Sequence, residues 1–121
     1  MKIIIAGAYA IGTHLARLLS RSKEEITLID ESEEHLASIG SDCDLLTMIG
    51  KPTSLQTLRD AGVQDTDLFI AVTPVESTNI TPSILAKNLG AKRTVARVDN
   101  PEYMEPQAQE FFKELGISKL I

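Results

Sequence analysis

Short apolar runs rich in Ile, Leu and Val alternate along the chain with longer segments in which apolar residues recur every three or four positions. The short runs predict strands that are buried on both faces of a sheet, and the longer segments predict amphipathic helices. The predicted strands are residues 2–6, 26–29, 44–49, 68–72, 94–98 and 119–121. The predicted helices are residues 10–22, 32–39, 54–61, 82–89 and 101–115, the last of them broken by Pro106.

The residues at the expected helix ends agree with this division. Ser32 and Ser54 (or its neighbour Thr53) are expected to be N-caps, because a hydroxyl oxygen there accepts a hydrogen bond from the first turn. Pro82 is expected within the first turn of its helix, where a missing N–H removes no helical hydrogen bond.

Regular alternation of strands and helices predicts an α/β fold, a Rossmann-like doubly wound parallel sheet with helices on both faces. A chain of 121 residues is expected to form one such domain, residues 1–121. The sequence stops inside an apolar run, so we expect it to be a fragment of a longer protein.

Composition narrows the classes of function. The 12 Lys and Arg residues are outnumbered by 17 Asp and Glu, giving a net charge of −5 with no basic stripe, so we expect no nucleic-acid partner. Cys43 is the one cysteine and is expected to be a reduced thiol, without a nearby histidine that would make it a nucleophile. His14 and His35 have no partners at metal-ligand spacing, so no metal site is expected. We therefore expect a soluble cytoplasmic domain.

The loop between the first predicted strand and helix carries the clearest binding pattern. Gly7, Ala8, Tyr9, Ala10, Ile11 and Gly12 form a dinucleotide fingerprint whose middle glycine is replaced by Tyr9. Asp30 ends the second predicted strand, 18 residues after Gly12, where a carboxylate accepts hydrogen bonds from ribose hydroxyls and repels a 2′-phosphate. This pair of features predicts NAD or another adenine nucleotide rather than NADP.

Two further strand ends carry polar side chains. Arg97 ends the fifth predicted strand and is expected to face a fixed anion, either a phosphate or a carboxylate of the protein. Thr73 follows the fourth predicted strand, where its hydroxyl and amide either contact a ribose or phosphate or belong to an ordinary strand end.

Several segments line up, in order, with one known family. They are residues 7–16, 28–30, 58–63, 67–73, 79 and 96–103. Together these segments resemble the N-terminal nucleotide-binding domain of Trk-type potassium uptake regulators, the KTN or RCK family. The resemblance covers essentially the whole chain.

This resemblance implies a function and a set of site residues. It implies a domain without catalytic residues that binds NAD(H) or ATP/ADP, forms a homo-oligomer (a dimer, tetramer or ring) and regulates a membrane-embedded potassium transporter or channel from the cytoplasmic face. The implied binding positions are the 7–11 loop, Asp30, Thr73, Pro74 and Arg97. It also implies that a second, smaller domain follows in many members of the family.

Some positions depart from the family pattern and leave alternatives open. Tyr9 replaces a glycine, Lys51 follows Gly50 where an aspartate is usual, and Pro74 replaces an acidic or small residue. Either the pocket is lost, which leaves a nucleotide-free structural adaptor, or the Tyr9 backbone still turns under the phosphates while its ring points outward. An NAD-dependent oxidoreductase domain is the other alternative, although no residues are placed to transfer a proton beside a nicotinamide. The apolar residues of the last helical region are expected either in the core or in an oligomer interface: Tyr103, Met104, Phe111, Phe112 and Leu115.

Overall fold

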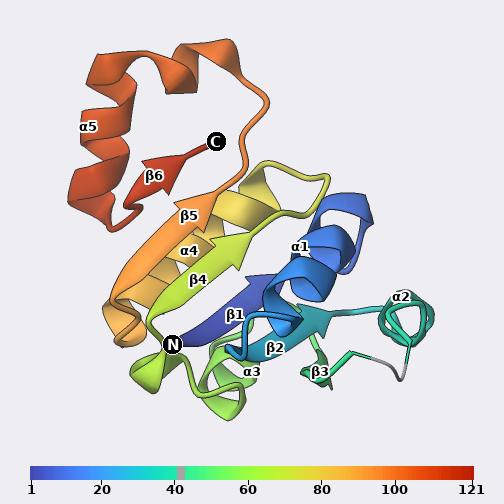
Figure 1. Cartoon of the computed structure of the whole chain (residues 1–121). Coiled ribbons are helices and arrows are strands. Elements are labelled where there is room, and N and C mark those ends of the chain that lie inside the picture. The colour runs from blue at the N-terminus through green and yellow to red at the C-terminus, as the bar shows by residue number, and fades with distance from the viewer. Residues whose placement is uncertain (41–42) are drawn as a thin grey trace.

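A computed structural model describes residues 1–40 and 43–121, which form a parallel sheet between layers of helices (Figure 1). The strands are β1 (Lys2–Ala6), β2 (Glu25–Asp30), β3 (Leu46–Ile49), β4 (Leu68–Ala71), β5 (Arg93–Ala96) and β6 (Lys119–Leu120). They pair in the order β3-β2-β1-β4-β5-β6, and every neighbouring pair is parallel. The predicted Rossmann-like doubly wound α/β fold is confirmed.

The helices connect these strands in the predicted alternation. They are α1 (Ala10–Ser20), α2 (Glu33–Ala37), α3 (Leu55–Asp60), α4 (Ser77–Leu89) and α5 (Pro106–Leu115), with 3₁₀ turns η1 (Val63–Asp65) and η2 (Pro101–Met104). The predicted caps are confirmed, because the Ser32 hydroxyl accepts from the His35 N–H and the Ser54 hydroxyl accepts from the Thr57 N–H. The predicted break is confirmed, because α5 begins at Pro106 and Glu105 separates it from η2.

The beginning of α4 differs from the prediction. The helix begins at Ser77, so Pro82 lies in its interior and not in its first turn. The earlier start is stabilised by tertiary hydrogen bonds, since the Asn79 side chain in the first turn bonds to the ends of both β4 and β5. These contacts offset the helical bond that Pro82 cannot donate.

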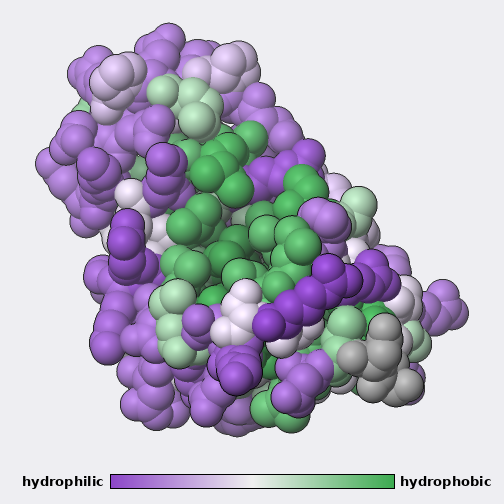
Figure 2. Space-filling view, viewed as in Figure 1, coloured by the Kyte–Doolittle hydropathy of each residue, from purple (hydrophilic) through white to green (hydrophobic). Residues whose placement is uncertain are grey.

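Each face of the sheet packs against its own helices. On one face, called here the α1 face, buried residues of β1, β2 and β4 pack against α1 and α2. On the other, the α4 face, alternate residues of the same strands pack against α3 and α4. Figure 2 shows apolar side chains gathered on the α1 face between α1 and α5, where Leu68 and Val95 are half-buried.

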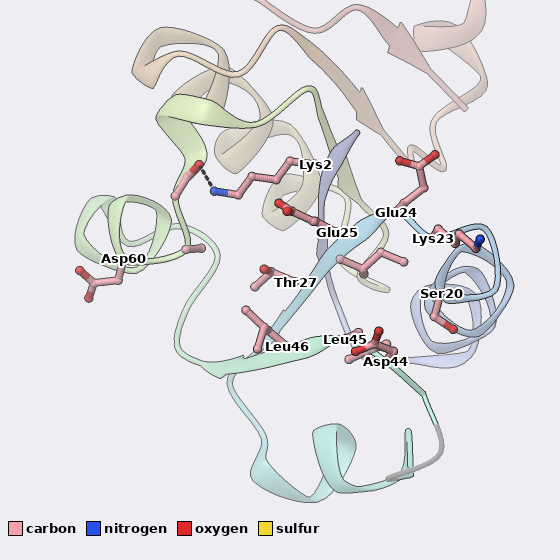
Figure 3. A pocket seen from close by; sticks show the side chains of 13 residues that line it. Lys2, Ser20, Lys23, Glu24, Glu25, Thr27, Asp44, Leu45, Leu46 and Asp60 are labelled. Carbon is pink, nitrogen blue, oxygen red and sulfur yellow. Dashed lines mark hydrogen bonds between the residues drawn. The ribbon is translucent and has the colours of Figure 1, made fainter.

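A cavity of about 740 Å³ opens at the amino ends of β1, β2 and β3. Figure 3 shows Lys2 and Glu25 on its wall, with Thr27 and Leu46 where β3 begins to pair with β2. The Lys2 ammonium there donates to the Gly62 carbonyl at 3.1 Å. The loops predicted to bind a nucleotide lie at the opposite ends of these strands.

Candidate functional site

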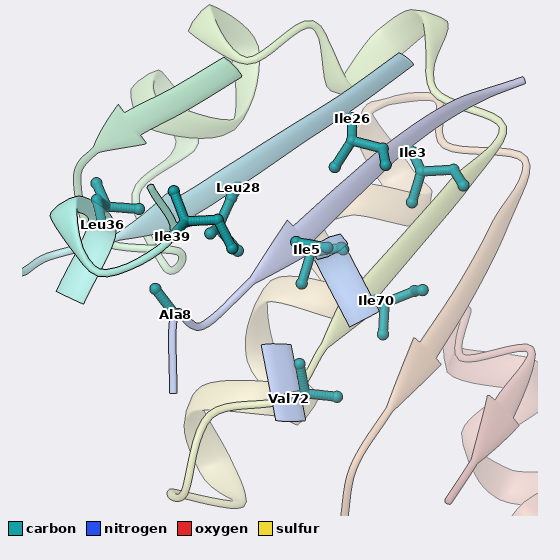
Figure 4. Packing of buried hydrophobic residues seen from close by; sticks show 10 residues of the cluster. Ile3, Ile5, Ala8, Ile26, Leu28, Leu36, Ile39, Ile70 and Val72 are labelled. Atoms are coloured by element: carbon teal, nitrogen blue, oxygen red, sulfur yellow. The ribbon is translucent and has the colours of Figure 1, made fainter. Parts of the chain in front are cut away.

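The strand order reverses between β1 and β4, because the chain leaves β1 toward β2 and leaves β4 toward β5. Ligands of doubly wound sheets bind beyond the carboxyl ends of the strands at such a point. The glycine loop, residues 7–12, lies there. Figure 4 shows how the loop is anchored: Ala8, Leu36 of α2 and Val72 after β4 belong to one buried cluster on the α1 face.

The two glycines that remain in the loop meet distinct spatial demands. Gly7 has a φ of +115°, and its N–H donates to the Ile29 carbonyl at 2.8 Å. A Cβ on Gly12 would lie 1.7 Å from the Gly7 carbonyl oxygen, so only glycine allows α1 to begin this close to the end of β1. The predicted tight turn and close helix packing are therefore both present.

Tyr9, at the missing glycine, has an extended backbone with φ −99° and ψ −164°, a conformation open to any residue. The first bond of α1 runs from the Thr13 N–H to the Tyr9 carbonyl, so the preceding N–H groups have no partner within the helix. The Tyr9 side chain is 41% exposed, and its ring packs edge-on against His35 with the ring centroids 4.6 Å apart. The side chain thus points toward α2 while the backbone keeps the turn.

Asp30 is buried at the end of β2, with 4% of its surface exposed. Its Oδ1 accepts from the Ala8 N–H at 2.9 Å, and its Oδ2 accepts from the Ser32 N–H at 2.9 Å. His35 Nδ1 lies 3.0 Å from the same Oδ2. The carboxylate therefore joins the glycine loop to the start of α2, and its bond to the glycine loop is the part that the sequence did not predict.

Thr73 lies directly against Gly7, on the other side of the glycine loop. Its N–H and its hydroxyl both donate to Asn79 Oδ1, at 2.7 and 2.8 Å. The Asn79 Nδ2 in turn donates to the carbonyls of Thr73 and Arg97. The Thr73 donors expected to face a ligand are therefore bonded within the protein, while Pro74 beside it is exposed.

Arg97 lies at the next strand end, with its side chain 35% exposed. One guanidinium nitrogen is 3.4 Å from the Thr73 carbonyl oxygen, and another is 3.7 Å from the Asp99 carboxylate. The fixed anion that was expected beside Arg97 is therefore, at least in part, the Asp99 carboxylate of the protein itself. Because a guanidinium has five N–H donors, Arg97 keeps donors for a further anion.

The contacts made by two residues of this region were not predicted from the sequence. Asn79, 1% exposed, was a position of the family resemblance but lay outside the predicted helix 82–89, so its bonds to two strand ends had no local signal. The Glu76 carboxylate accepts from the N–H groups of Asp99 and Asn100, which holds the loop after β5 against the start of α4. No local pattern pairs residues 76 and 99.

The remaining candidates lie at the margin of the site. Lys51 is exposed and follows Gly50, whose N–H donates to the Asp30 carbonyl, so it stands beside the end of β2. Cys43 packs on the α1-face cluster as a free thiol. In residues 1–40 and 43–121, no three His, Cys, Asp or Glu side chains are grouped to hold a metal ion.

At the opposite edge of the sheet, the Asp67 carboxylate is bonded to two donors. The Lys2 N–H and the Lys92 ammonium both bond to the Asp67 carboxylate at the amino ends of the strands, and they lower the pKa of Asp67. The site itself is organised by hydrogen bonds and by the close approach of backbone segments.

This strand order, with a glycine turn after β1 and a buried acid at the end of β2, defines a Rossmann-type domain of the nucleotide-binding class. The model of the TrkA-N domain family matches residues 3–121. The chain belongs to this family.

Curated relatives carry the same domain. The chain is 37% identical over 115 residues to the Trk system potassium uptake protein TrkA of Haemophilus influenzae, covering 94% of the chain and 25% of that protein. It is 31% identical over 121 residues to a TrkA homolog of Methanothermobacter thermautotrophicus, covering 100% of the chain and 54% of the relative. The chain thus spans about a quarter to a half of the length of these relatives.

Solved structures share the fold. The RCK domain of GsuK superposes with a TM-score of 0.76 at 29% identity, covering 99% of this chain and 24% of that one. The GsuK channel bound to NAD gives 0.80 at 17% identity, covering 99% and 21%. The Kef CTD of Shewanella denitrificans in its AMP-bound form gives 0.70 at 21%, covering 100% and 70%. Among the helices that the structure describes, none has the length and apolar character needed to cross a membrane.

Proposed function

We propose that this domain binds NAD(H), or ATP/ADP as the alternative, and acts as a non-catalytic regulatory domain of a potassium uptake system. The observation that carries the proposal is the Asp30 carboxylate, buried at the end of β2 and bonded to the N–H of Ala8 in the glycine turn. This arrangement supports the proposal, because a carboxylate can accept from ribose hydroxyls and the first N–H groups of α1, which have no partner within the helix, lie close to it.

The proposed contacts follow from the geometry of the loops. The backbone of the 7–12 loop (Gly7, Ala8, Tyr9, Ala10, Ile11 and Gly12) faces the phosphates, because the first N–H groups of an 11-residue helix attract anions. Asp30 accepts from the ribose. Thr73 and Pro74 border the opposite side of the loop, and Arg97 donates to a phosphate with the N–H groups that Thr73 and Asp99 leave free.

The proposed partners rest on the relatives. Those named as Trk potassium uptake proteins, and the RCK domain of GsuK at 29% identity, support a membrane-embedded potassium transporter or channel as the partner. In this proposal the domain forms a homo-oligomer at the cytoplasmic face of that partner. Regulation then requires the nucleotide to bind one arrangement of the subunits more tightly than another, because equal affinity shifts no equilibrium.

Thermal melting with NADH, NAD, ATP, ADP and NADPH in turn tests the binding step. A ligand present at about a hundred times its Kd adds about 2.7 kcal/mol of stability. For a chain of this size that corresponds to a rise in Tm of roughly 10 °C. We expect this rise with NAD(H) or with ATP/ADP, and little with NADPH, because Asp30 repels a 2′-phosphate.

Two variants locate the binding event. Asp30→Asn is expected to remove most of the nucleotide-induced rise in Tm, whereas Asp65→Asn, an exposed acid in η1, is expected to keep it. Flat melting curves for all five nucleotides would contradict the proposal and favour a structural adaptor. That outcome would mean that the internal donors of Asp30 and the Tyr9 ring keep nucleotides out.

A further inference from the structure

The three groups that donate to Asp30 differ in how easily they can move away from the carboxylate. Ala8 and Ser32 donate backbone N–H groups, which are fixed by the glycine turn and by the start of α2. His35 donates from a side chain that is 40% exposed, so rotation about its own bonds is enough to break the contact. His35 is therefore the donor that a ligand can replace without unfolding the loop.

The imidazole and a ribose hydroxyl offer Asp30 the same chemistry. Each presents one hydrogen to a carboxylate oxygen, and the Nδ1 of His35 lies 3.0 Å from Oδ2. Tyr9 of the glycine loop packs its ring against the imidazole and supports it from the side where the loop meets α2. The Tyr9 ring thus contacts the His35 imidazole, and the imidazole contacts the Asp30 carboxylate. The imidazole therefore occupies the position proposed for the ribose.

We propose that His35, supported by Tyr9, is a proton-sensitive competitor of the nucleotide ribose for Asp30. The inference rests on the proposed nucleotide binding and adds regulation to that same site. A protonated imidazole makes a charge-assisted bond to the carboxylate and is harder to displace than a neutral one. Histidine changes its charge between pH 5 and 8, so the competition varies across the physiological range.

The charges around His35 give the direction of the effect. The charged partner in contact with His35 is Asp30; of the cations on adjoining segments, Arg17 bonds to the Ser38 carbonyl at the far end of α2, and Lys51 follows Gly50. The acidic and phenolic groups on the adjoining segments are Asp30 and Glu31 at the end of β2, Glu33 and Glu34 on α2, and Tyr9 in the glycine loop.

When the imidazole carries a proton on both nitrogens, the Asp30 carboxylate is its ion-pair partner. A ribose that displaces the imidazole removes its strongest partner, so nucleotide binding releases a proton. By linkage, nucleotide affinity is expected to fall as the pH is lowered across the range in which histidines gain a charge.

Calorimetric titration with NAD at pH 5.5 and at pH 8.0 tests this competition. NAD is the suitable probe because its two phosphates form a diester-like pyrophosphate that does not titrate in this range, unlike the terminal phosphates of AMP, ADP and ATP. We expect NAD to bind the natural chain several-fold more weakly at pH 5.5 than at pH 8.0, because a charge-assisted bond between His35 and Asp30 is harder to displace than a neutral one. Repeating the titration in buffers of different ionisation enthalpy measures proton release, because the observed binding enthalpy then changes with the buffer.

Three variants separate the explanations. His35→Ala removes the competitor and is expected to bind NAD at pH 5.5 at least as tightly as the natural chain does at pH 8.0. His35→Gln keeps a donor that does not titrate, so its affinity is expected to be the same at both pH values. His14→Gln, exposed on α1, is the matched control and is expected to keep the full pH dependence.

Distinct outcomes contradict the inference and the proposed function. A pH dependence that persists in His35→Ala and His35→Gln, or that is absent from the natural chain, overturns the competition while nucleotide binding stands. A large loss of affinity in His35→Ala at pH 8.0, with an unchanged circular dichroism spectrum, overturns it too and makes His35 a support of the site. If NAD binds no variant at either pH while ATP or ADP raises the Tm, the NAD assignment fails and the competition with it.

Discussion

Gly12 and Asn79 show how single residues hold the strand ends together. One acts by having no side chain at the point where α1 meets the glycine turn. The other acts through a buried amide that joins Thr73 after β4 to Arg97 after β5. In both cases the geometry of the site depends on one position that no neighbour can replace.

Gly12→Ala is expected to destabilise the domain by about 3 kcal/mol, at the upper end of the range for overpacking. The added methyl would lie 1.7 Å from the Gly7 carbonyl oxygen, and this backbone atom cannot rotate away. Urea unfolding measures the change. His14→Ala, exposed on the same helix, is expected to stay within about 0.5 kcal/mol. Equal stability of the natural chain and Gly12→Ala would show that α1 can shift outward freely.

Asn79→Leu is expected to cost roughly 3 kcal/mol, because it keeps the volume but removes the partners of buried polar groups. The Thr73 N–H and the Arg97 carbonyl are left without the amide that pairs them. The midpoint of urea unfolding again measures the effect. Asn88→Leu is the control, since Asn88 is exposed on the same helix and donates to the Ile84 carbonyl one turn earlier, within its own helix. Similar losses in both variants would exclude a special role for Asn79.

At the scale of elements, the two ends of the sheet are tied by different interactions. The carboxyl ends are joined by Asp30, Asn79 and Glu76, which bond to loops from neighbouring strands. The amino ends are joined by Asp67, which precedes β4 and bonds to the Lys2 N–H at 2.8 Å and the Lys92 ammonium at 3.0 Å. Asp67 therefore links β4 to the strands on either side of it.

Asp67 makes the stability of this end depend on pH. Its pKa in the folded protein is lowered, first by the Lys2 N–H and then by Lys92, so its contribution is present above the ordinary pKa of an aspartate and is lost as the pH falls through the folded value. Asp67→Asn is expected to lower the Tm at pH 7 and to reduce the loss of Tm between pH 5 and pH 3. Asp65→Asn, two residues earlier and exposed, is expected to keep the natural pH profile. An unchanged acid slope in Asp67→Asn would contradict the assignment.

At the scale of the whole molecule, the apolar residues near the carboxyl end divide between the core and the surface. Tyr103 and Phe112 stack edge-on with the ring centroids 5.1 Å apart and pack against Leu120 and Ile117. Phe111 and Leu115, on the outer side of α5, are 58% and 53% exposed. The core alternative therefore holds for Tyr103 and Phe112, which are partly buried, whereas Met104, Phe111 and Leu115 are exposed and an oligomer interface stays a prediction for them.

If the domain forms the proposed homo-oligomer through this outer side of α5, Phe111→Glu is expected to weaken self-association at least tenfold. A charge at that position is costly to bury against an apolar surface, yet costs little in the monomer, where Phe111 is already exposed. Sedimentation velocity over a concentration series measures the change, with Lys113→Glu as the control on the same helix. Unchanged association in Phe111→Glu would place the interface elsewhere.

Much of the fold could be predicted because it depends on short-range chemistry. The Ile3–Ile5 run and the Leu28–Ile29 pair are apolar enough to require burial on both faces, and Ser32 and Ser54 cap helices within three residues of themselves. The predictions failed where a residue far along the chain decided the outcome. The start of α4 is one example, because it depends on bonds from Asn79 to Arg97, 18 residues later.

The sequence by itself determined the strands, most of the helices, the glycine turn and the acid at the end of the second strand, because each follows from periodicity or from backbone chemistry within a few residues. Only the tertiary structure decided which donors meet which acceptors at the strand ends. Parallel pairing brings β2, β1, β4 and β5 side by side, so that Asp30 meets Ala8 and His35, and Thr73 meets Asn79. These hydrogen bonds depend on how far apart the segments lie in the folded protein, and the sequence alone does not give those distances.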